Sequence, residues 1–434
     1  VTLDADGKIT AGDFAGDLAA VLPALAADLF VTSDGVVQPI AAADVSTLYV
    51  NGEWAVTPDT VKGTILDDGK YYDINAYSSA SDAFDSFTAE NRNIELIGDQ
   101  LLKTDFDDGG EWPKRNFDLA LDGDLTLKAA DGAESTLTLT VVDSQNSGGG
   151  STNQVGELAF YSSSADQRAT FTLEKGVTID TNAKIWFGRP TQSSSSDTTP
   201  TDIVVNGNII QQAHDGRYYG ILQIQTEKDS TVLVNGSVAF GWTLSVRGAV
   251  FTVSSTGEVK ASDPASTSST ILVDARSGVG GKFIVDGSKA VSAVVLDVDE
   301  LGSFEMKNEA AAAFDTVDLA KNATLLVADG STLTADAVTN AGTIQITGEN
   351  GKLAVAEGGL TNKGAIVFGA SDKTVNTTFD VGMLSKKAGS SAFNFQNGEV
   401  TLTGVMADGI RIQPFNVGRN SENVALDAAS AIVN

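Results

Sequence analysis

Cysteine is absent from this chain of 434 residues, histidine occurs once and methionine three times. Without cysteine, neither a disulfide nor a thiolate metal site can form. The single histidine, His214, excludes any metal site that needs several imidazole ligands. Apolar runs are short as well, and none reaches the roughly 18 residues of a membrane-spanning helix. We therefore expect no transmembrane segment and a fold held by noncovalent packing alone.

Basic side chains are also few, with 28 Lys and Arg against 57 Asp and Glu, which gives a formal net charge of -29. Such a field repels phosphate backbones and anionic lipid headgroups. We therefore expect no nucleic-acid partner. The acidic surface favours solubility, divalent cations or an extracellular setting. Hydrophobic residues still make up 42% of the chain, which is enough to build a core.

The residue usage favours a location outside the cell. A chain without cysteine that is rich in Ser, Thr, Asn, Gly and Asp is typical of secreted bacterial surface proteins. The start at Val1 shows no basic stretch followed by an apolar core, so it does not resemble a signal peptide. We expect a mature exported protein at a prokaryotic cell surface, and a cytosolic chain stays open as the alternative.

A short phrase recurs in the second half of the chain. An apolar strand runs into a turn built on Asn-Gly or Asn-x-Gly, and another short strand follows, as in Val205 to Ile209, Val234 to Val238, Asn340 to Ile344 and Asn362 to Ile366. An antiparallel sandwich gives no reason for this motif to recur at the same position of each repeat, whereas a stack of equivalent coils does. We attribute the glycines to turn positions with positive φ that recur once per coil.

This repetition predicts an all-β protein, a parallel β-helix with a small N-terminal α+β cap unit. Asn322, Asn340 and Asn362 should then lie in adjacent coils along one edge of the rod. We expect four segments along the chain: an α+β unit at 1–60, a capping segment at 61–93, the β-helix at 94–415 and a C-terminal tail at 416–434.

Helical patterns are confined to the N-terminal part. Apolar spacing predicts a helix over about 11–29, kinked at Pro23. A second helix is expected at 81–90, with Ala83, Phe84 and Phe87 on its apolar face, because an uncovered first coil would expose the rod's interior. Later in the chain only Asn308 to Phe314 has a helical composition, and it is too short to stand alone.

Two phrases, Leu333 to Ile346 and Gly359 to Phe368, resemble those of right-handed parallel β-helix bacterial surface proteins. The resemblance extends over roughly residues 90 to 415, and it is strongest to autotransporter-adhesin passenger domains and β-helical surface-layer proteins. It implies a right-handed coil and a role at the cell surface. It does not assign any functional residue.

One metal site is suggested by the first residues of the chain. Thr2 to Phe14 resembles an EF-hand or dockerin loop, with Asp4 and Asp6 at the third and fifth ligand positions and Asp13 at the twelfth. Thr2 at the first ligand position and the short side chain of Asp13 depart from the motif. Calcium is therefore the one cofactor we expect, and an acidic turn with Asp13 near a helix N-terminus is the alternative.

Two carboxylate pairs have spacing suited to acid/base chemistry, since parallel β-helices also carry polysaccharide lyases and hydrolases. Asp297 and Asp299 alternate onto one strand face, as do Asp122 and Asp124. A solvated strand face explains both pairs equally. Elsewhere, His214 fits a turn, and the residues near it fit either a sugar-contact patch or an aromatic stack along the coil: Arg217, Tyr218, Tyr219 and Trp242.

The expected function is that of a non-enzymatic extracellular structural protein. It would be a self-assembling surface-layer or fibre subunit or an adhesin, with subunit contacts through the chain ends and with a glycan or host-surface ligand as the other partner. Val424 to Leu426 and Ala431 to Val433 would add strands to a neighbouring copy. The alternatives are a polysaccharide-degrading β-helix enzyme and a glycan-binding module.

Overall fold

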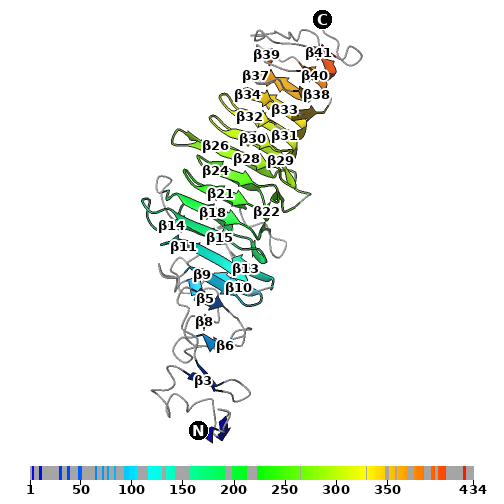
Figure 1. Ribbon diagram of the computed structural model, residues 1–434. Coiled ribbons are helices and arrows are strands. Elements are labelled where there is room, and N and C mark those ends of the chain that lie inside the picture. The colour runs from blue at the N-terminus through cyan, green and yellow to red at the C-terminus, as the bar shows by residue number, and fades with distance from the viewer. Residues whose placement is uncertain are drawn as a thin grey trace, which may run out of the picture.

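The computed structural model is a right-handed parallel β-helix whose coils stack into a long rod (Figure 1). From residue 92 to residue 368 the structure describes most of the chain, and outside that stretch it describes short strands and the helical residues Ala83 and Phe84. The described stretches between 92 and 368 are 92–104, 116–129, 133–141, 157–190, 198–212, 222–263, 265–328, 330–347, 351–356 and 359–368.

Two long sheets run the length of the rod. The 14-stranded sheet, which we call the narrow sheet, receives one strand from each coil, and all its pairings are parallel. Its strands are β5 Thr47–Val50, β8 Ala76–Tyr77, β9 Asn93–Leu96, β12 Leu125–Ala129, β15 Ala169–Leu173, β18 Thr201–Val205, β21 Thr231–Val234, β24 Val250–Val253, β28 Lys282–Asp286, β30 Ser303–Lys307, β32 Thr324–Val327, β34 Thr343–Ile346, β37 Ala365–Phe368 and β39 Ala392–Phe395.

The 21-stranded sheet, which we call the wide sheet, consists of two parallel ladders in its N-terminal half. The first ladder contains β10 Gln100–Thr104, β13 Ser135–Val141, β16 Val177–Thr181, β19 Asn208–Gln211, β22 Ser237–Phe240 and β25 Glu258–Ala261. The second contains β11 Asn116–Leu121, β14 Glu157–Ser162, β17 Lys184–Phe187, β20 Gln223–Thr226, β23 Thr243–Arg247 and β26 Thr270–Arg276. A coil therefore has three faces here.

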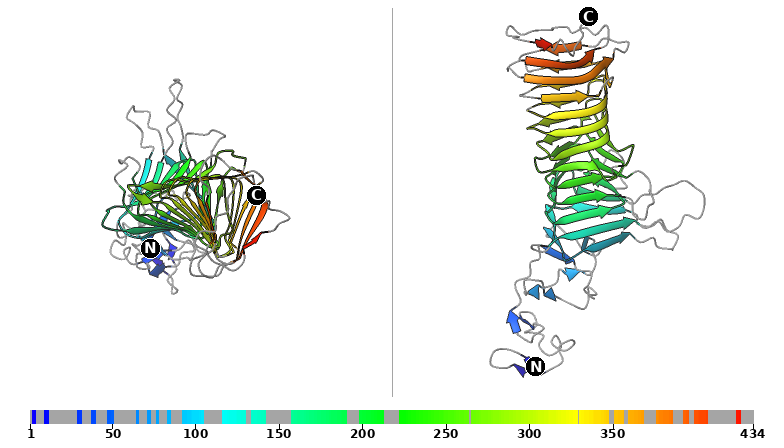
Figure 2. Two further views of the ribbon diagram at one scale, coloured as in Figure 1. Left: turned by 90° about the horizontal axis from the view of Figure 1, so that it is seen from above. Right: turned by 90° about the vertical axis from the view of Figure 1, so that its right-hand side faces the viewer.

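From β29 onward the two ladders merge, because β29 pairs with strands of both. Single long strands then take the place of two short ones, as Figure 2 shows toward the C-terminal end of the rod. The long strands are β29 Ala290–Val298, β31 Ala311–Leu319, β33 Thr332–Asn340, β38 Asn376–Ser385 and β40 Glu399–Met406. In one coil between them, two short strands, β35 Gly351–Val355 and β36 Leu360–Asn362, both pair with β33, and the last strand, β41 Val424–Leu426, is short.

A few strands pair antiparallel. β27 Val279–Gly280 folds back on β26, and the N-terminal part of the chain holds three short hairpins. Their strands are β1 Thr2–Leu3 with β2 Ile9–Ala11, β3 Leu29–Val31 with β4 Val37–Pro39, and β6 Thr64–Ile65 with β7 Tyr71–Tyr72.

Strand alternation builds the core. In the narrow sheet, every second side chain points inward and pairs in register with an apolar residue of the next coil. Phe251, Phe283 and Phe304 illustrate this, because their rings stack at centroid distances of 5.0 and 5.3 Å with interplanar angles of 13°. All three side chains are fully buried. The interior is thus one continuous apolar column, which repeated burial of such residues stabilises.

The turn glycines have a different cause from the one we expected. Gly207, Gly236, Gly342 and Gly364 do not have positive φ angles. Instead, a Cβ atom on Gly236 would lie 1.9 Å from the carbonyl oxygen of Gly207, and one on Gly364 would lie 2.1 Å from that of Gly342. Consecutive turns approach so closely that a side chain has no room, so the recurring glycine reflects stacking distance rather than φ.

The asparagine positions lie in adjacent coils at one turn, as predicted, but they are not all in one register. Asn340 pairs directly with Asn362. Asn322 precedes Thr324, which pairs with Thr343, so Asn322 is in register with Ala341 instead. Its φ of 65° places it in the left-handed region that Asn tolerates well.

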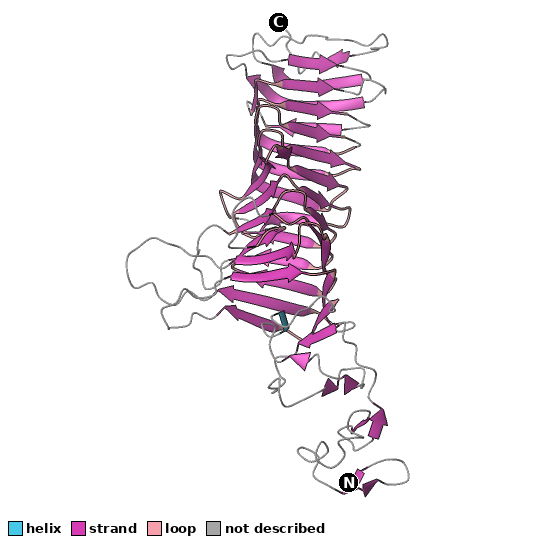
Figure 3. Ribbon diagram, turned by 90° about the vertical axis from the view of Figure 1, so that its left-hand side faces the viewer, coloured by secondary structure: helices cyan, strands magenta, loops and turns pink. Residues whose placement is uncertain are grey.

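The capping helix is present at two described positions. Ala83 and Phe84 are helical and buried, and the Phe84 ring packs edge-on against Phe117 of the second ladder, with a centroid distance of 5.2 Å. Figure 3 shows this helical piece at the N-terminal end of the coil stack. Burial of its apolar face against the first coils agrees with the expected function of covering the interior.

Two other helical expectations have different outcomes. The predicted helix over 11–29 lies mostly outside the described residues, and its two ends belong to β2 and β3. The Ala-rich stretch is not helical, because Ala311–Leu319 is strand β31 and Asn308 and Glu309 form a turn with positive φ. Pairing of Ala312 with Val291 and Leu333 in neighbouring coils outweighs the helix propensity of alanine.

Candidate functional site

The outer face of the wide sheet carries a register column that changes character along the rod. Trp186 pairs with Gln225, which pairs with Ser245. Further along, Leu272 pairs with Asp297, and Asp297 pairs with Asp318. The column therefore runs from an aromatic and amide cluster into a set of carboxylates, and the carboxylate end is the candidate functional site.

Four carboxylates gather at this site. Asp297 and Asp318 are in register on β29 and β31, and the electrostatic influence of Asp274 and Asp299 also reaches Asp297. Burial first, and then the nearby charges of Asp299, Asp318 and Asp274, together raise the pKa of Asp297 to about 6. Burial and Asp274 likewise raise the pKa of Asp299. Asp297 is thus a carboxyl group that releases its proton at a higher pH than an ordinary aspartate.

Positive charge reaches only the edge of the cluster. The Nε of Arg247 donates a hydrogen bond to Asp274 at 3.2 Å. A cavity of about 610 Å³ adjoins Asp274 and Asp299, and Glu300 and Lys321 line its rim. Among the residues that the structure describes, no group of three or more carboxylate or imidazole side chains is arranged to hold a metal ion.

The sequence pattern identified part of this site. Asp297 and Asp299 both point outward, as the alternation predicted, because Leu296 and Val298 between and beside them are fully buried. The sequence pattern did not single out Asp318, although it pairs with Asp297 one coil later. Searching for acidic residues at the coil period would have found it.

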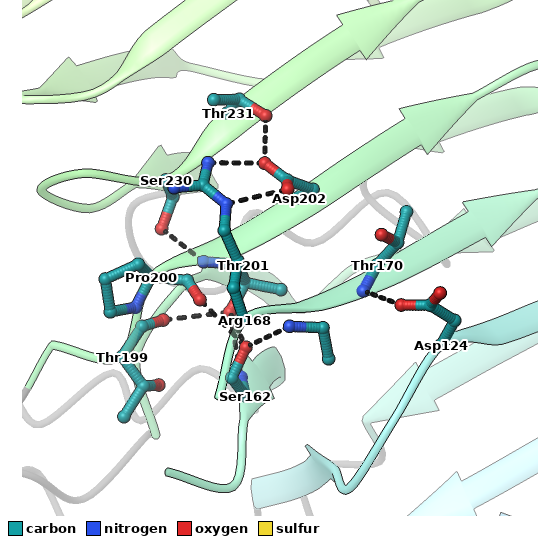
Figure 4. A network of polar contacts seen from close by, with 11 residues as sticks. Asp124, Ser162, Arg168, Thr170, Thr199, Pro200, Thr201, Asp202, Ser230 and Thr231 are labelled. Atoms are coloured by element: carbon teal, nitrogen blue, oxygen red, sulfur yellow. Dashed lines mark hydrogen bonds and ion pairs between the residues drawn. The ribbon is translucent and has the colours of Figure 1, made fainter. Parts of the chain in front are cut away.

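The second predicted pair, Asp122 and Asp124, connects coils instead of forming a reactive pair. Asp122 accepts a hydrogen bond from the Ser163 hydroxyl at 2.6 Å, and Asp124 accepts one from the backbone N–H of Thr170 at 2.8 Å. Figure 4 shows the second of these contacts. Both carboxylates are occupied in joining consecutive coils, so a structural role explains them.

A network of hydrogen bonds from buried hydroxyl groups lies at the same corner of the rod (Figure 4). The Thr201 hydroxyl receives the backbone N–H of Ser162 at 2.8 Å and donates to the carbonyl of Thr199 at 2.8 Å, while the Ser230 hydroxyl accepts the backbone N–H of Thr201 at 3.2 Å. These contacts satisfy backbone groups that the corner leaves unpaired. Their function is to join three coils.

Next to this network, Arg168 forms a two-point ion pair with Asp202, at 2.7 and 2.5 Å, and the Thr231 hydroxyl donates to the same carboxylate. Although burial raises the pKa of Asp202, the hydrogen bonds from Arg168 and Thr231 outweigh it and lower the pKa overall. Asp202 therefore stays ionised and acts as a clamp between coils.

Sequence reasoning missed a buried charge cluster at the other end of the register column. The Glu227 side chain is fully buried, and it lies 3.6 Å from Arg189 and 3.8 Å from Arg276. Gln225 donates to the same carboxylate at 2.5 Å. Trp186 lies beside this group, with the Arg189 guanidinium 4.5 Å from its ring centroid. Arg276 comes from β26 and Arg189 follows β17, so the cluster unites distant parts of the chain.

Of the remaining candidate residues, only Trp242 lies among the residues that the structure describes. Trp242 is 46% exposed in the turn between β22 and β23. Among the described residues, no helix is long and apolar enough to cross a membrane. The candidate side chains that lie outside the described residues are Asp4, Asp6, Asp13, His214, Arg217, Tyr218 and Tyr219.

The comparisons with known proteins leave the fold as the main guide to function. Neither protein-family models, nor curated proteins, nor solved structures gave a match to this chain.

Proposed function

We propose that this chain is an extracellular structural protein, a β-helix rod that assembles with copies of itself into a surface layer or fibre or serves as an adhesin. The observation that supports this is the unbroken apolar column, which continues through every described coil from Leu125 to Ile366. A core of this kind makes a long, stiff body whose length is not limited by surface-to-volume scaling.

The polar contacts support the same proposal. Asp202, Asp124 and Glu227 each join neighbouring coils, and so do the hydroxyls around Thr201. A rod that bears load along its axis needs such bonds between coils, because each coil otherwise contacts only its two neighbours. Much of the buried polar chemistry is thus used for cohesion.

Self-association would use the ends of the sheets. Among the strands that the structure describes, the narrow sheet ends at β8 and β39, and β41 is the C-terminal end of the wide sheet. A terminal strand offers unpaired backbone N–H and C=O groups to which another copy can add a strand. The proposal therefore places subunit contacts at the chain ends, and calcium at the N-terminal loop is the cation to test.

Electron microscopy of the purified protein, with and without calcium, tests this proposal. We expect ordered layers or fibres that are lost when residues 1–15 or 420–434 are deleted. The substitution Gln345→Ala, on the outer face of the narrow sheet, is the control and should leave assembly intact. A chain that stays monomeric at high concentration, with or without calcium, would contradict the proposal.

A polysaccharide-cleaving enzyme is the second candidate, and the Asp297 site favours it. The pKa of Asp297 is raised to about 6, and Asp318 is in register on the next strand, at a strand spacing of about 4.8 Å. Retaining glycosidases place two carboxyl groups about 5 Å apart, one as the acid and one as the nucleophile. Asp297 would protonate the glycosidic oxygen, and the Asp318 carboxylate would attack the anomeric carbon.

Reducing-end assays on neutral and acidic glycans test the second candidate. Cleavage should disappear, falling by about 100-fold or more, in Asp297→Asn and in Asp318→Asn, as expected when an acid or nucleophile is removed. Asp315→Asn is the control, because Asp315 is exposed on the same strand as Asp318. Equal activity in all three variants, or no cleavage by the wild-type protein, would rule this candidate out.

A further inference from the structure

A polar groove runs along the corner between the narrow sheet and the first ladder of the wide sheet. It extends from the turn before β10 to the turn before β29, and its volume is about 1450 Å³. Each coil in this range contributes a turn to the lining. With coils about 4.8 Å apart, the groove is roughly 30 Å long and parallel to the rod axis.

Glycine allows the turns that line this groove to stack closely. Gly207 and Gly236 line it, and the Cβ contacts described above show that neither position accepts a side chain. A Cβ on Gly207 would lie 2.2 Å from the carbonyl oxygen of Val177. The turns along the groove therefore stack with no side chain between them at these positions.

Amide groups follow the groove axis. The Nδ2 of Asn235 donates a hydrogen bond to the Oδ1 of Asn206 in the preceding coil at 2.9 Å. Beside them, the Nδ2 of Asn208 donates to the Thr178 hydroxyl at 3.2 Å. Within the described part of the chain, the Nδ2 of Asn206 and the Oδ1 of Asn235 make no other hydrogen bond, although an amide can serve as donor and acceptor at once. The Asn206–Asn235 pair thus offers one hydrogen-bond donor and one acceptor to a ligand.

Charges in the groove nearly cancel. Three lysines face four carboxylates among its lining residues, on a chain with a net charge of -29. A polyanion would gain no compensating positive charge there, and a polycation would bind the acidic surface as a whole. The groove residues in question are Lys128, Lys175, Lys289, Asp99, Glu134, Glu174 and Glu258.

We propose that this groove binds a linear, uncharged polysaccharide whose chain lies along the rod axis. Sugar hydroxyl groups both donate and accept hydrogen bonds, so they can pair with the Nδ2 of Asn206 and the Oδ1 of Asn235. Sugar units would meet a similar set of turn groups at each coil. An extended peptide fits less well, because it binds by adding to a free strand edge, and the strands flanking the groove are paired on both sides.

Calorimetric titration of the full chain tests the proposal, with cellohexaose, xylohexaose and mannohexaose as uncharged probes. The corresponding trimers, polygalacturonate and an uncharged Ser/Thr-rich hexapeptide complete the set. We expect at least one neutral hexamer to bind more tightly than its trimer. The double variant Asn206→Leu with Asn235→Leu should weaken that binding about tenfold, the effect of losing two neutral hydrogen bonds.

Two further variants separate binding from folding. Ser237→Met narrows the groove without changing the amides and should also weaken binding. Gln345→Leu removes an amide from the outer face of the narrow sheet, away from the groove, and should leave binding unchanged. Circular dichroism and the thermal midpoint establish that each variant is folded.

The proposal is overturned if no neutral hexamer binds, if the peptide or polygalacturonate binds in preference, or if Gln345→Leu weakens binding as much as the groove variants. It does not depend on self-assembly. A rod that forms layers without binding these glycans refutes only the groove, and a monomer that binds them refutes only the assembly.

Discussion

Glu227 shows how a charged residue can be part of a solenoid's structure. Its carboxylate is removed from water, which is costly, and Arg189, Arg276 and Gln225 surround it. The two arginines keep a little contact with solvent. The net energy of these ion pairs is therefore less important than the cost of removing Glu227, because each arginine would lose a buried charged partner.

We expect Glu227→Gln to lower the free energy of unfolding by about 2 kcal/mol, since it removes the buried negative charge that pairs with two largely buried guanidinium groups. Urea denaturation followed by circular dichroism measures this change. Glu258→Gln is the matched control, because Glu258 pairs with Lys260 at a more exposed position, and it should cost less than about 0.5 kcal/mol. Equal losses in the two variants would contradict a role for burial.

The Asp297 carboxyl predicts a pH dependence of stability. Its folded pKa of about 6 lies above the ordinary value near 4, so the folded chain binds more protons than the unfolded chain between these pH values. The free energy of unfolding should then fall as pH rises through this window. Asp297→Asn should remove this contribution and stabilise the protein at pH 7 by less than about 1 kcal/mol, because solvent reaches the side chain.

Thermal melts at pH 4, 5, 6 and 7 measure this difference between wild type and variant. Asp315→Asn serves as the reference, since Asp315 is exposed. A difference between wild type and Asp297→Asn that does not change with pH would contradict the raised pKa.

Single residues were only partly predictable from the sequence. The outward direction of Asp297 and Asp299 follows from the alternation of one strand. The raised pKa depends on Asp318 and Asp274 in neighbouring strands, and Glu227 depends on Arg276 from β26. Such contacts require the register between coils, which an isolated strand does not contain.

At the scale of elements, the turns determine how closely coils stack. We expect Gly236→Ala to cost about 3 kcal/mol, since its Cβ would overlap the Gly207 carbonyl oxygen and force the turns apart. Gly98→Ala is the matched control, because Gly98 has a φ of 70° and open space around it. It should cost about 1 kcal/mol, from the backbone alone. Chemical denaturation of both variants distinguishes the two causes.

The elements themselves were well anticipated where strands alternate between Asn- and Gly-containing turns. Strands β21 Thr231–Val234 and β34 Thr343–Ile346 flank the recurring turns at Val234 to Val238 and Asn340 to Ile344, as the sequence pattern predicts. Asn308 to Phe314 has a helical composition but is too short to stand alone as a helix, and its alanines lie in a strand that pairs with two flanking strands. The pattern gave the wrong reason for the glycines, because close approach of backbones is a property of two coils together.

At the scale of the whole molecule, stability should be distributed along the rod. We expect Phe283→Ala to cost about 4 kcal/mol, because Phe283 stacks between Phe251 and Phe304 in the core. In a solenoid such a loss weakens the interfaces between nearby coils most. Calorimetry should therefore show an early transition for part of the chain. Ile284→Ala, with its side chain on the outer face, should cost much less and leave one transition.

The merging of the two ladders at β29 has a consequence for how long this protein can be. Beyond that point Ser303, Thr324, Thr343 and Ala365 pair in succession, each at the start of a narrow-sheet strand. Residues 303–323 are therefore one interchangeable unit, and their removal would bring Thr324 next to Lys282 with the strand phase preserved. Adding or removing one coil in this part would therefore change the length of the rod by about 4.8 Å and leave both of its ends unchanged.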